Sequence, residues 1–310
     1  MHSPRPAGMA PSQTLVLINP RAGGGRAGRL AEPMRRWLQT HGPGVRLAVI
    51  DGIDEAEQQI QTGPIGLRVV LVGGDGTVHR MLASLLVRRC EFGLVPAGSG
   101  NDIARAMGVA GLGWRAALSH ALSAQATPLD VGECAFGGRT VLFLSSLAGG
   151  FDAAVGARAL KTPGWLGGHA RYLWATLREL QSLQTWRMRV RVDGREVHLG
   201  RTLFASALNT PSYGAGLPAV PQARADDGRL DALLAGRFGR LGALGMLPRL
   251  MLGRHLTHPR VSTQAFTEMI VDSETAVPLA ADGEPVGRAH SWRVRVRIGA
   301  LPAMCRQQAD

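Results

Sequence analysis

The sequence predicts a chain in two parts, an α/β domain built on a parallel sheet followed by a mostly antiparallel β domain. Between residues 14 and 128, short apolar runs alternate with segments whose apolar residues recur at helical spacing. This order indicates a parallel sheet covered by helices on both faces, in three layers. After residue 129, strands in which apolar residues alternate with arginine indicate a sheet with one charged face.

The elements of the first part follow one another in strand–helix order. The expected strands span residues 14–19, 45–50, 67–72 and 92–95. The expected helices span residues 29–40, 55–61, 77–88 and 113–124. Ligands of such sheets bind at the carboxyl ends of the strands. The glycine-rich turns that follow three of these strands should therefore gather along one edge.

The second part shows period-two alternation at residues 186–192, where apolar residues alternate with arginine. Asp193 and Gly194 follow and give a strong hairpin signal. Residues 292–298 repeat the alternation, and one helical insert is expected at residues 165–184. The arginines of the two strands are either an ordinary solvated face or a surface that helps to bind an anionic membrane.

The length of 310 residues is long for one hydrophobic core, and a content of 45% hydrophobic residues is enough for two. The polar, proline-rich start lacks the apolar segment of a signal peptide, so it is expected to be a disordered tail. The three cysteines are widely spaced and lack metal-ligand spacing, which fits a reducing, cytoplasmic location. The expected limits are a tail at 1–13, domains at 14–130 and 131–300, and a C-terminal tail at 301–310 that is free or returns to the first domain.

The formal net charge of +12 favours an anionic partner, such as a membrane surface, nucleic acid or a phosphorylated substrate. A nucleic-acid binder is disfavoured because only 5% of the residues are aromatic and no nucleic-acid-binding motif is present. No segment has the roughly 18 apolar residues in a row that a membrane-spanning helix needs. The composition therefore predicts a soluble or peripheral protein.

Residues 72–78 read V-G-G-D-G-T-V, so a strand pattern passes through glycines into a helical pattern. A helix N-terminus binds anions through its unpaired N–H groups, and glycines let phosphates approach closely. Asp75 would repel a phosphate unless a cation lay between them, which favours a Mg²⁺-nucleotide site. The alternative is an Asp-Gly turn with Thr77 as the helix N-cap. Two similar turns, at residues 19–26 and 96–102, favour the nucleotide site.

Three motifs follow one another in fixed order: N-P-x-A-G-x-G at 19–25, G-G-D-G-T at 73–77 and P-x-G-[ST]-x-N-D-x-A-R at 96–105. Together they resemble the catalytic domain of diacylglycerol kinases, whose superfamily includes bacterial lipid kinases and the sphingosine and ceramide kinases. D-D-G-R-L-D at 226–231 and D-G-E at 282–284 extend the resemblance over nearly the whole chain. G-G-D-G-T alone is shared with NAD kinases and phosphofructokinases, whereas the late segments are more specific.

The resemblance implies an ATP- and Mg²⁺-dependent lipid kinase that phosphorylates the hydroxyl of a diacylglycerol-like or sphingoid alcohol. The first domain would resemble that of NAD kinase and phosphofructokinase, the second would be a β-sandwich that binds the lipid, and the nucleotide would lie between them. The substrate would be met at an anionic membrane surface, which implies a cytoplasmic, peripherally associated protein. The oligomeric state stays open, with a homodimer as one option.

By position, the resemblance also implies a nucleotide site, two metal sites and a proton acceptor. The nucleotide would contact Asn19, Pro20, Arg21, Ala22, Gly23, Gly73, Gly74, Gly76, Thr77, Val78, His79, Arg80, Ser99 and Asn101. Asp75 would act in catalysis beside Mg²⁺, together with Asn101. A structural metal would be bound by Asp227 and by the backbone carbonyls of Arg224 and Arg229. Glu284 would take the proton from the lipid hydroxyl, with Asp282 as the other option.

Some positions depart from the pattern of the family. His79 and Arg80 stand where bacterial lipid kinases usually have Asn and Glu, which leaves the substrate class open. Asp51 stands about where the family often has a nucleotide-contacting Thr, which leaves that one contact open. Two other functions remain: a kinase of a soluble alcohol or dinucleotide, similar to NAD kinase, and a non-catalytic lipid-binding protein that retains the fold.

Overall fold

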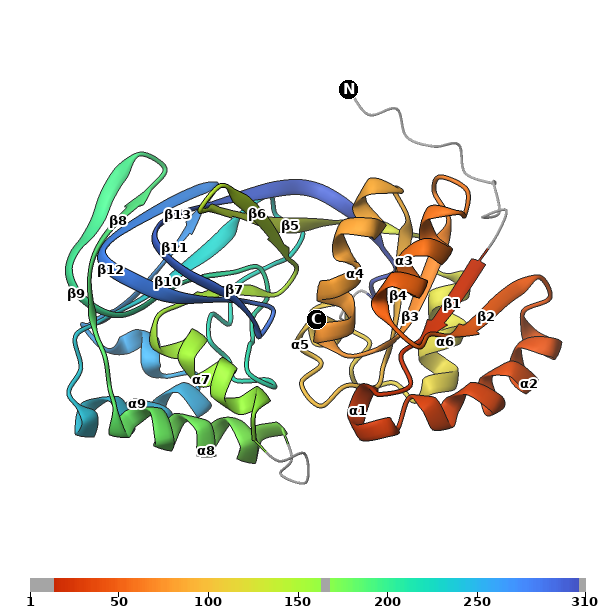
Figure 1. Cartoon of the computed structure of the whole chain (residues 1–310), viewed down its shortest axis with the longest axis horizontal. Helices are drawn as coiled ribbons and strands as arrows, with labels where there is room; N and C mark the ends of the chain where they lie inside the picture. The colour runs from red at the N-terminus through yellow and green to blue at the C-terminus, as the bar shows by residue number, and fades with distance from the viewer. Residues whose placement is uncertain (1–13, 163–167, 307–310) are drawn as a thin grey trace.

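The computed structural model describes residues 14–162 and 168–306. The tail expected at residues 1–13 and the first residues of the expected helical insert, Trp165 and Leu166, lie outside the described residues. The described chain forms an α/β region and a β-rich region, which lie side by side in Figure 1. The fold class expected from the sequence is confirmed.

The α/β region is a parallel sheet with strand order β4-β3-β1-β2. Its strands are β1 (Thr14–Ile18), β2 (Val45–Val49), β3 (Arg68–Gly73) and β4 (Glu91–Pro96). Its helices are α1 (Ala22–Gly25), α2 (Ala31–His41), α3 (Ile53–Gln61), α4 (Asp75–Val87), α5 (Asp102–Ala106) and α6 (Trp114–Ser123), with a 3₁₀ turn η1 (Gly28–Leu30). The short helices α1 and α5 were not predicted, because neither is long enough to show an apolar period.

Strand β3 shows why the sheet needs helices on both faces, because all of its residues are buried. Val69 and Leu71 pack in one core with residues of α3, α4 and α5. Val70 and Val72 pack in a second core with residues of α2 and α6. Successive side chains of a strand point to opposite faces, so an uninterrupted apolar run requires cover on each.

The β-rich region is antiparallel in all of its internal strand pairs within the described residues. Its strands are β5 (Thr127–Phe136), β6 (Arg139–Phe143), β7 (Ser146–Gly149), β8 (Trp186–Val192), β9 (Arg195–Leu208), β10 (Leu230–Gly236), β11 (Val261–Phe266), β12 (Glu268–Ala281) and β13 (Glu284–Ala303). The inward-facing residues of these strands form one core that contains the fully buried Trp292.

The hairpin expected at Asp193 and Gly194 is confirmed. Strands β8 and β9 pair up to Val192 and Arg195, and the two turn residues have φ angles of 46° and 80°. Positive φ at both central residues matches the right-handed twist of the flanking strands. At the other end of the chain, Ala303 pairs in parallel with Phe92 of β4, so the last part of β13 joins the sheet of the α/β region.

The β-rich region contains three described helices where one was predicted: α7 (Phe151–Leu160), α8 (Gly168–Gln181) and α9 (Arg240–Met251), together with a 3₁₀ turn η2 (His255–Thr257). The expected insert corresponds to α8. Helix α9 gave no amphipathic signal because apolar residues occupy all of its faces. No helix within the described ranges is both long and apolar enough to cross a bilayer.

Candidate active site

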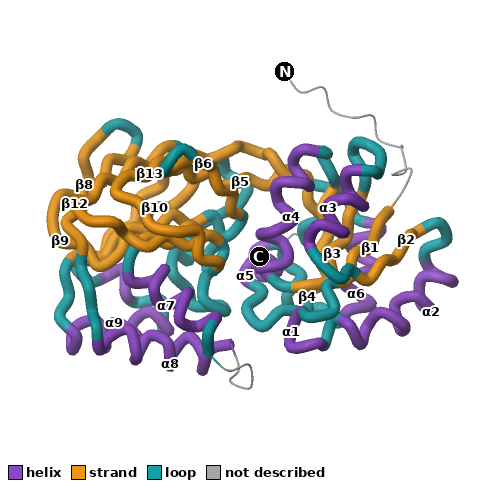
Figure 2. Tube along the Cα trace, viewed as in Figure 1, coloured by secondary structure: helices purple, strands orange, loops and turns teal. Residues whose placement is uncertain are grey.

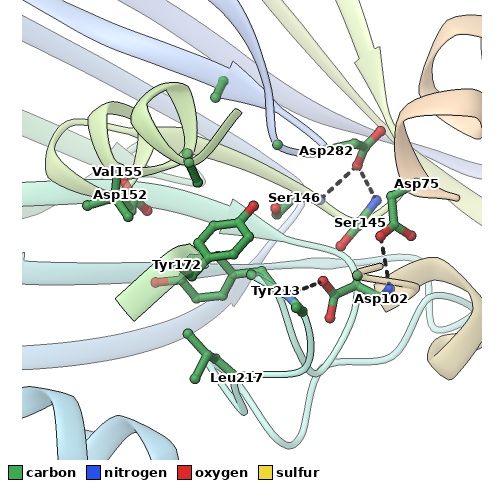
Figure 3. Close-up of a pocket in the computed structure, with 18 of the residues that line it drawn as sticks. Asp75, Asp102, Ser145, Ser146, Asp152, Val155, Tyr172, Tyr213, Leu217 and Asp282 are labelled. Atoms are coloured by element: carbon green, nitrogen blue, oxygen red, sulfur yellow. Dashed lines mark hydrogen bonds between the residues drawn. The ribbon is translucent and has the colours of Figure 1, made fainter. Parts of the chain in front are cut away.

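A cavity of about 750 Å³ lies between the two regions and is lined by both. On the α/β side it is lined by the turns that follow β1, β3 and β4, which meet at one sheet edge as expected. Figure 3 shows Asp75, Asp102 and Asp282 grouped at one end of the cavity, with Asp152 and Val155 toward the other. The cavity therefore has a polar end and an apolar end.

The turns at the polar end touch one another through glycines. A Cβ on Gly74 would lie 2.7 Å from the Cα of Gly98, and a Cβ on Gly98 would lie 2.6 Å from the Cα of Gly74. Gly23 has a φ of +60°, and a Cβ there would lie 2.0 Å from the carbonyl oxygen of Ala97. Only residues without a Cβ allow the three turns to approach this closely.

Helix α4 begins at this contact. Gly74 is its N-cap residue, with extended backbone and no side-chain cap. The alternative with Thr77 as N-cap is therefore wrong: Thr77 lies inside the helix, and its hydroxyl accepts a hydrogen bond from the amide of Asn19 at 2.9 Å. The first N–H groups of a helix lack helical acceptors, so the N-terminus of α4 is suited to bind an anion.

Asp75 is the first residue of α4 and lines the cavity. Its carboxylate accepts hydrogen bonds from the backbone N–H groups of Asp102 and Ile103 at 3.2 and 3.0 Å, which connects α4 to α5. Burial, followed by the negative charge of Asp102, raises the pKa of Asp75 to about 6. A carboxylate destabilised in this way is well placed to interact with a cation.

Asp102 was part of a motif but was not predicted as a site residue. Its buried carboxylate accepts hydrogen bonds from the Ser212 hydroxyl at 2.8 Å and from the backbone N–H groups of Ala215 and Gly216, both at 2.9 Å. It also pairs with Arg105 at 2.8 Å. Asp102 thus fixes a loop of the β-rich region against α5. The N-D pair in the third motif was the signal that marked it.

The carboxylate of Asp282 is fully buried and highly coordinated. The backbone N–H groups of Leu144, Ser145 and Ser146 donate to it at 3.0, 2.6 and 3.1 Å. The imidazole of His79 lies 3.1 Å away. Burial lowers the pKa of His79, but the hydrogen bond and charge of Asp282 outweigh this effect and raise it above the usual value. These contacts hold the turn between β12 and β13 in place.

Glu284 projects from the same turn toward the α/β region. A Cβ on Gly76 would lie 2.7 Å from Oε1 of Glu284, so this carboxylate rests against the first turn of α4. Glu284 and Asp75 line the same cavity although they are far apart in the sequence. The structure thereby brings together a helix N-terminus and a carboxylate from the other region.

The other predicted nucleotide residues divide into two groups. Asn19, Arg21, Ala22, Gly23, Gly74, Gly76, Thr77, Arg80 and Ser99 line the cavity, whereas Pro20, Gly73, Val78, His79 and Asn101 do not. Val78 is buried in the core, and the Asn101 amide exchanges two hydrogen bonds with the backbone of Gly98, each of 3.0 Å. The five residues that do not line the cavity can affect the site only through the residues that do.

The turn with the predicted structural metal lies away from the cavity, between β9 and β10. Asp227 is exposed and accepts a hydrogen bond from the backbone N–H of Arg229 at 3.0 Å, while the Arg224 side chain pairs with Asp226. Across the part of the chain that the structure describes, no three His, Cys, Asp or Glu side chains form a metal-binding group. A metal here would depend on backbone oxygens and water, so this site stays a prediction.

The apolar end of the cavity is enclosed by α7, α8, α9 and strands β9 and β10. Its apolar lining comprises Phe151, Val155, Ala159, Leu160, Tyr172, Leu203, Phe204, Tyr213, Leu217, Leu233, Ala235, Phe238, Ala243, Met246, Leu247 and Leu250. Asp152 lies among them and bonds to the Ser206 hydroxyl, and burial raises its pKa to about 6. The helical insert expected from the sequence supplies Tyr172 to this lining, whereas the contributions of α7 and α9 depend on tertiary structure.

Two family models together match most of the chain. The diacylglycerol kinase catalytic domain matches residues 13–134, and the YegS C-terminal NAD kinase beta sandwich-like domain matches residues 145–305. The chain is 30% identical over 292 residues to a diacylglycerol kinase of Mycobacterium tuberculosis, covering 93% of this chain and 92% of the relative.

Solved structures share the fold. A diacylglycerol kinase from Bacillus anthracis superimposes with a TM-score of 0.71 at 16% identity, covering 95% of this chain and 97% of the other. An NAD kinase from Archaeoglobus fulgidus in complex with ATP gives a TM-score of 0.53 at 16% identity, covering 94% and 92%. The two-region architecture is thus that of NAD kinase-like folds.

Proposed function

Because the chain belongs to the diacylglycerol kinase catalytic-domain family, we propose that it transfers the γ-phosphoryl group of ATP to the hydroxyl of a diacylglycerol-like or sphingoid lipid alcohol. One observation carries this proposal. A single cavity joins a glycine-lined helix N-terminus, the carboxylates of Asp75 and Glu284, and an end lined by aliphatic and aromatic side chains.

The polar end suits the polyphosphate of ATP. The N-terminus of α4 offers N–H groups and a positive dipole end, while Arg21, Arg26 and Arg80 line the same end of the cavity. Phosphoryl transfer depends mainly on positioning and on neutralising charge, so the main task of these groups is to hold the phosphates in place.

The residues at this end also fit Mg²⁺. The Asp75 carboxylate accepts hydrogen bonds from the backbone N–H groups of Asp102 and Ile103, and Asp102 adds a second negative charge nearby. Mg²⁺ usually binds through one or two carboxylates together with substrate phosphates, which agrees with the lack of a three-residue metal group in the described residues. When bound, the ion would neutralise the charge that develops on the leaving phosphate.

Glu284 is the better placed proton acceptor. The oxygens of Asp282 are occupied by three backbone N–H groups and by His79, whereas Glu284 reaches across the cavity to α4. We assign Glu284 to accept the hydroxyl proton as the new oxygen–phosphorus bond forms. Asp282 would position the turn that carries it.

The test is to incubate the protein with γ-labelled ATP, Mg²⁺ and a total lipid extract, and to identify labelled products by mass spectrometry. Label in an organic-soluble phospholipid would support the proposal and identify the substrate. Label only in water-soluble products would instead favour a kinase of a soluble alcohol or dinucleotide. No labelled product under any condition would favour a non-catalytic lipid-binding protein.

Gly74→Ala should raise the KM for ATP by roughly tenfold or more, which corresponds to at least about 1.4 kcal/mol of lost binding. The added Cβ would strike the Cα of Gly98 and push the two turns apart. Initial rates at varied ATP would measure the effect. Gly111→Ala is the control, since a Cβ there meets nothing within 4 Å. An unchanged KM for Gly74→Ala would show that this contact does not shape the ATP site.

Gly156→Leu should raise the KM for the lipid and leave the KM for ATP unchanged. Gly156 lies on α7 and lines the cavity, and beyond its own helix the one described heavy atom within 4 Å of an added Cβ is the carbonyl oxygen of Gly283 at 3.8 Å. A leucine would therefore project into the cavity, whereas Gly156→Ala would add a single methyl group and serves as the control. An equal rise in both KM values would contradict a lipid site at this end.

A further inference from the structure

The exposed apolar residues of the protein are concentrated on one edge of the β-rich region. Eight of the fourteen large apolar side chains exposed in the described ranges lie at the end of α7, on α8, and on α9 with the residue that follows it. They are Leu160, Leu173, Trp174, Leu177, Leu241, Leu244, Met251 and Leu252. Figure 2 shows α8 and α9 along the same lower edge, and the two helices contact each other. We call these eight residues the helical face.

Helix α9 is apolar on both sides. Ala243, Met246, Leu247 and Leu250 line the cavity. On the opposite side, Leu241 and Leu252 are 86% and 69% exposed. A helix that is apolar on all sides is usually buried on all sides. The outer side of α9 is therefore expected to contact an apolar partner.

The charges around the helical face indicate which kind of partner this face binds. Residues 237–260 contain five arginines and no acidic residue. On α8, the Arg178 guanidinium lies 5.3 Å from the ring centre of the exposed Trp174. The only acidic residue of α8, Glu179, is paired with Arg158 at 3.1 Å. Apolar side chains mixed with unopposed cations are typical of surfaces that bind anionic bilayers.

The arginine-rich segments 186–192 and 292–298, the other candidate for membrane contact, differ from the helical face in that their arginines are paired. The six arginines of the alternating segments 186–192 and 292–298 each lie within salt-bridge distance of an acidic side chain, so that five acidic residues offset six arginines. The pairs are Arg187–Glu274, Arg189–Glu196, Arg191–Asp272, Arg293–Glu268, Arg295–Glu268 and Arg297–Glu133. This face is nearly neutral and carries little attraction for anionic lipid.

We propose that the helical face docks on an anionic phospholipid bilayer and brings the apolar end of the cavity to the lipid. The inference rests on the proposed function in one respect, namely that the substrate comes from the bilayer. Residues of α8 and α9 line the cavity, and Leu160 of the helical face lines it as well, so this face lies one helical layer from the apolar end. A second copy of the chain fits this face less well, because a two-fold contact would bring the arginines of both copies together.

The test is sedimentation of the full chain with vesicles of phosphatidylcholine and phosphatidylglycerol in equal parts. Leu241→Gln/Leu252→Gln should weaken vesicle binding by about tenfold or more. Arg249→Gln and Arg254→Gln should each weaken it by about fivefold. Ile65→Gln/Ile298→Gln is the matched control, because these residues are 69% and 70% exposed but lie outside the helical face. Replacing all six strand arginines with Gln should leave binding nearly unchanged.

Three results would overturn the docking proposal. The first is vesicle binding by Leu241→Gln/Leu252→Gln equal to that of the wild type, and the second is an equal loss of binding in the isoleucine control. The third is a light-scattering result in which Leu241→Gln/Leu252→Gln turns a dimer into a monomer without vesicles, which would assign the face to a second copy. Phosphorylation of a short-chain lipid dispersed in detergent is the separate readout for the proposed function. Activity that persists there while vesicle binding is lost would support docking by this face.

Discussion

Glu284→Gln should lower kcat for the lipid substrate by about 10²–10⁴-fold, the usual effect of removing a general base. Glutamine has nearly the same shape as glutamate but cannot accept the hydroxyl proton. The KM for ATP should stay nearly unchanged, because Glu284 touches α4 through Gly76 and does not form the glycine turns. Initial-rate kinetics at varied lipid and varied ATP, with a thermal melt of each preparation, would measure both effects.

Asp282→Asn is the informative comparison. Asparagine replaces one of the two oxygens that accept hydrogen bonds from the N–H groups of Leu144, Ser145 and Ser146. It also removes the negative charge that faces His79. This variant should melt at a lower temperature than wild type, whereas Glu284→Gln should not. Normal turnover in Glu284→Gln with a large loss in Asp282→Asn would assign the proton acceptor to Asp282. Near wild-type turnover in both variants would show that the proton acceptor does not lie in this turn.

Asp75→Asn should lower kcat by at least about 10²–10³-fold, because it removes the carboxylate charge that would hold Mg²⁺ at the polar end of the cavity. The fold should survive, since the amide oxygen can still accept a hydrogen bond from the N–H of Asp102 or Ile103. Asp75→Ala should lose both the activity and these hydrogen bonds. Similar turnover in wild type and Asp75→Asn at saturating ATP and Mg²⁺ would exclude a catalytic role for this carboxylate.

The raised pKa of Asp75 also predicts how the free energy of unfolding depends on pH, and Asp75→Asn is the variant that reveals it. Burial and the charge of Asp102 raise the pKa of Asp75 from 3.8 to about 6, so the folded state favours the protonated carboxyl. The stabilisation from this group is complete below about pH 4 and is lost as the pH rises through about 6, on the order of 3 kcal/mol in total. The free energy of unfolding of wild type minus that of Asp75→Asn should fall over this range. Urea denaturation with a chelator and without nucleotide would measure it, and a constant difference would contradict the burial of the charge.

The sequence by itself determined the elements whose signals are local. An uninterrupted apolar run such as β3 can be satisfied only by helices on both faces, and the glycine turns after β1, β3 and β4 must meet where parallel strands end. Asp193 and Gly194 specify a hairpin because few residue pairs tolerate positive φ at both positions. Each of these predictions depends on a few neighbouring residues and on fixed backbone geometry.

Only the tertiary structure decided how distant segments combine. The sequence leaves Asp282 and Glu284 as alternatives, and the proposed choice of Glu284 depends on the N–H groups of 144–146 and on the approach of β13 to α4. The link from Asp102 to the loop at 212–216 is equally non-local. Helix α9 carries no amphipathic period because one side lines the cavity and the other is exposed. Contacts between residues far apart in the chain leave no periodic trace in the sequence, so packing alone settles them.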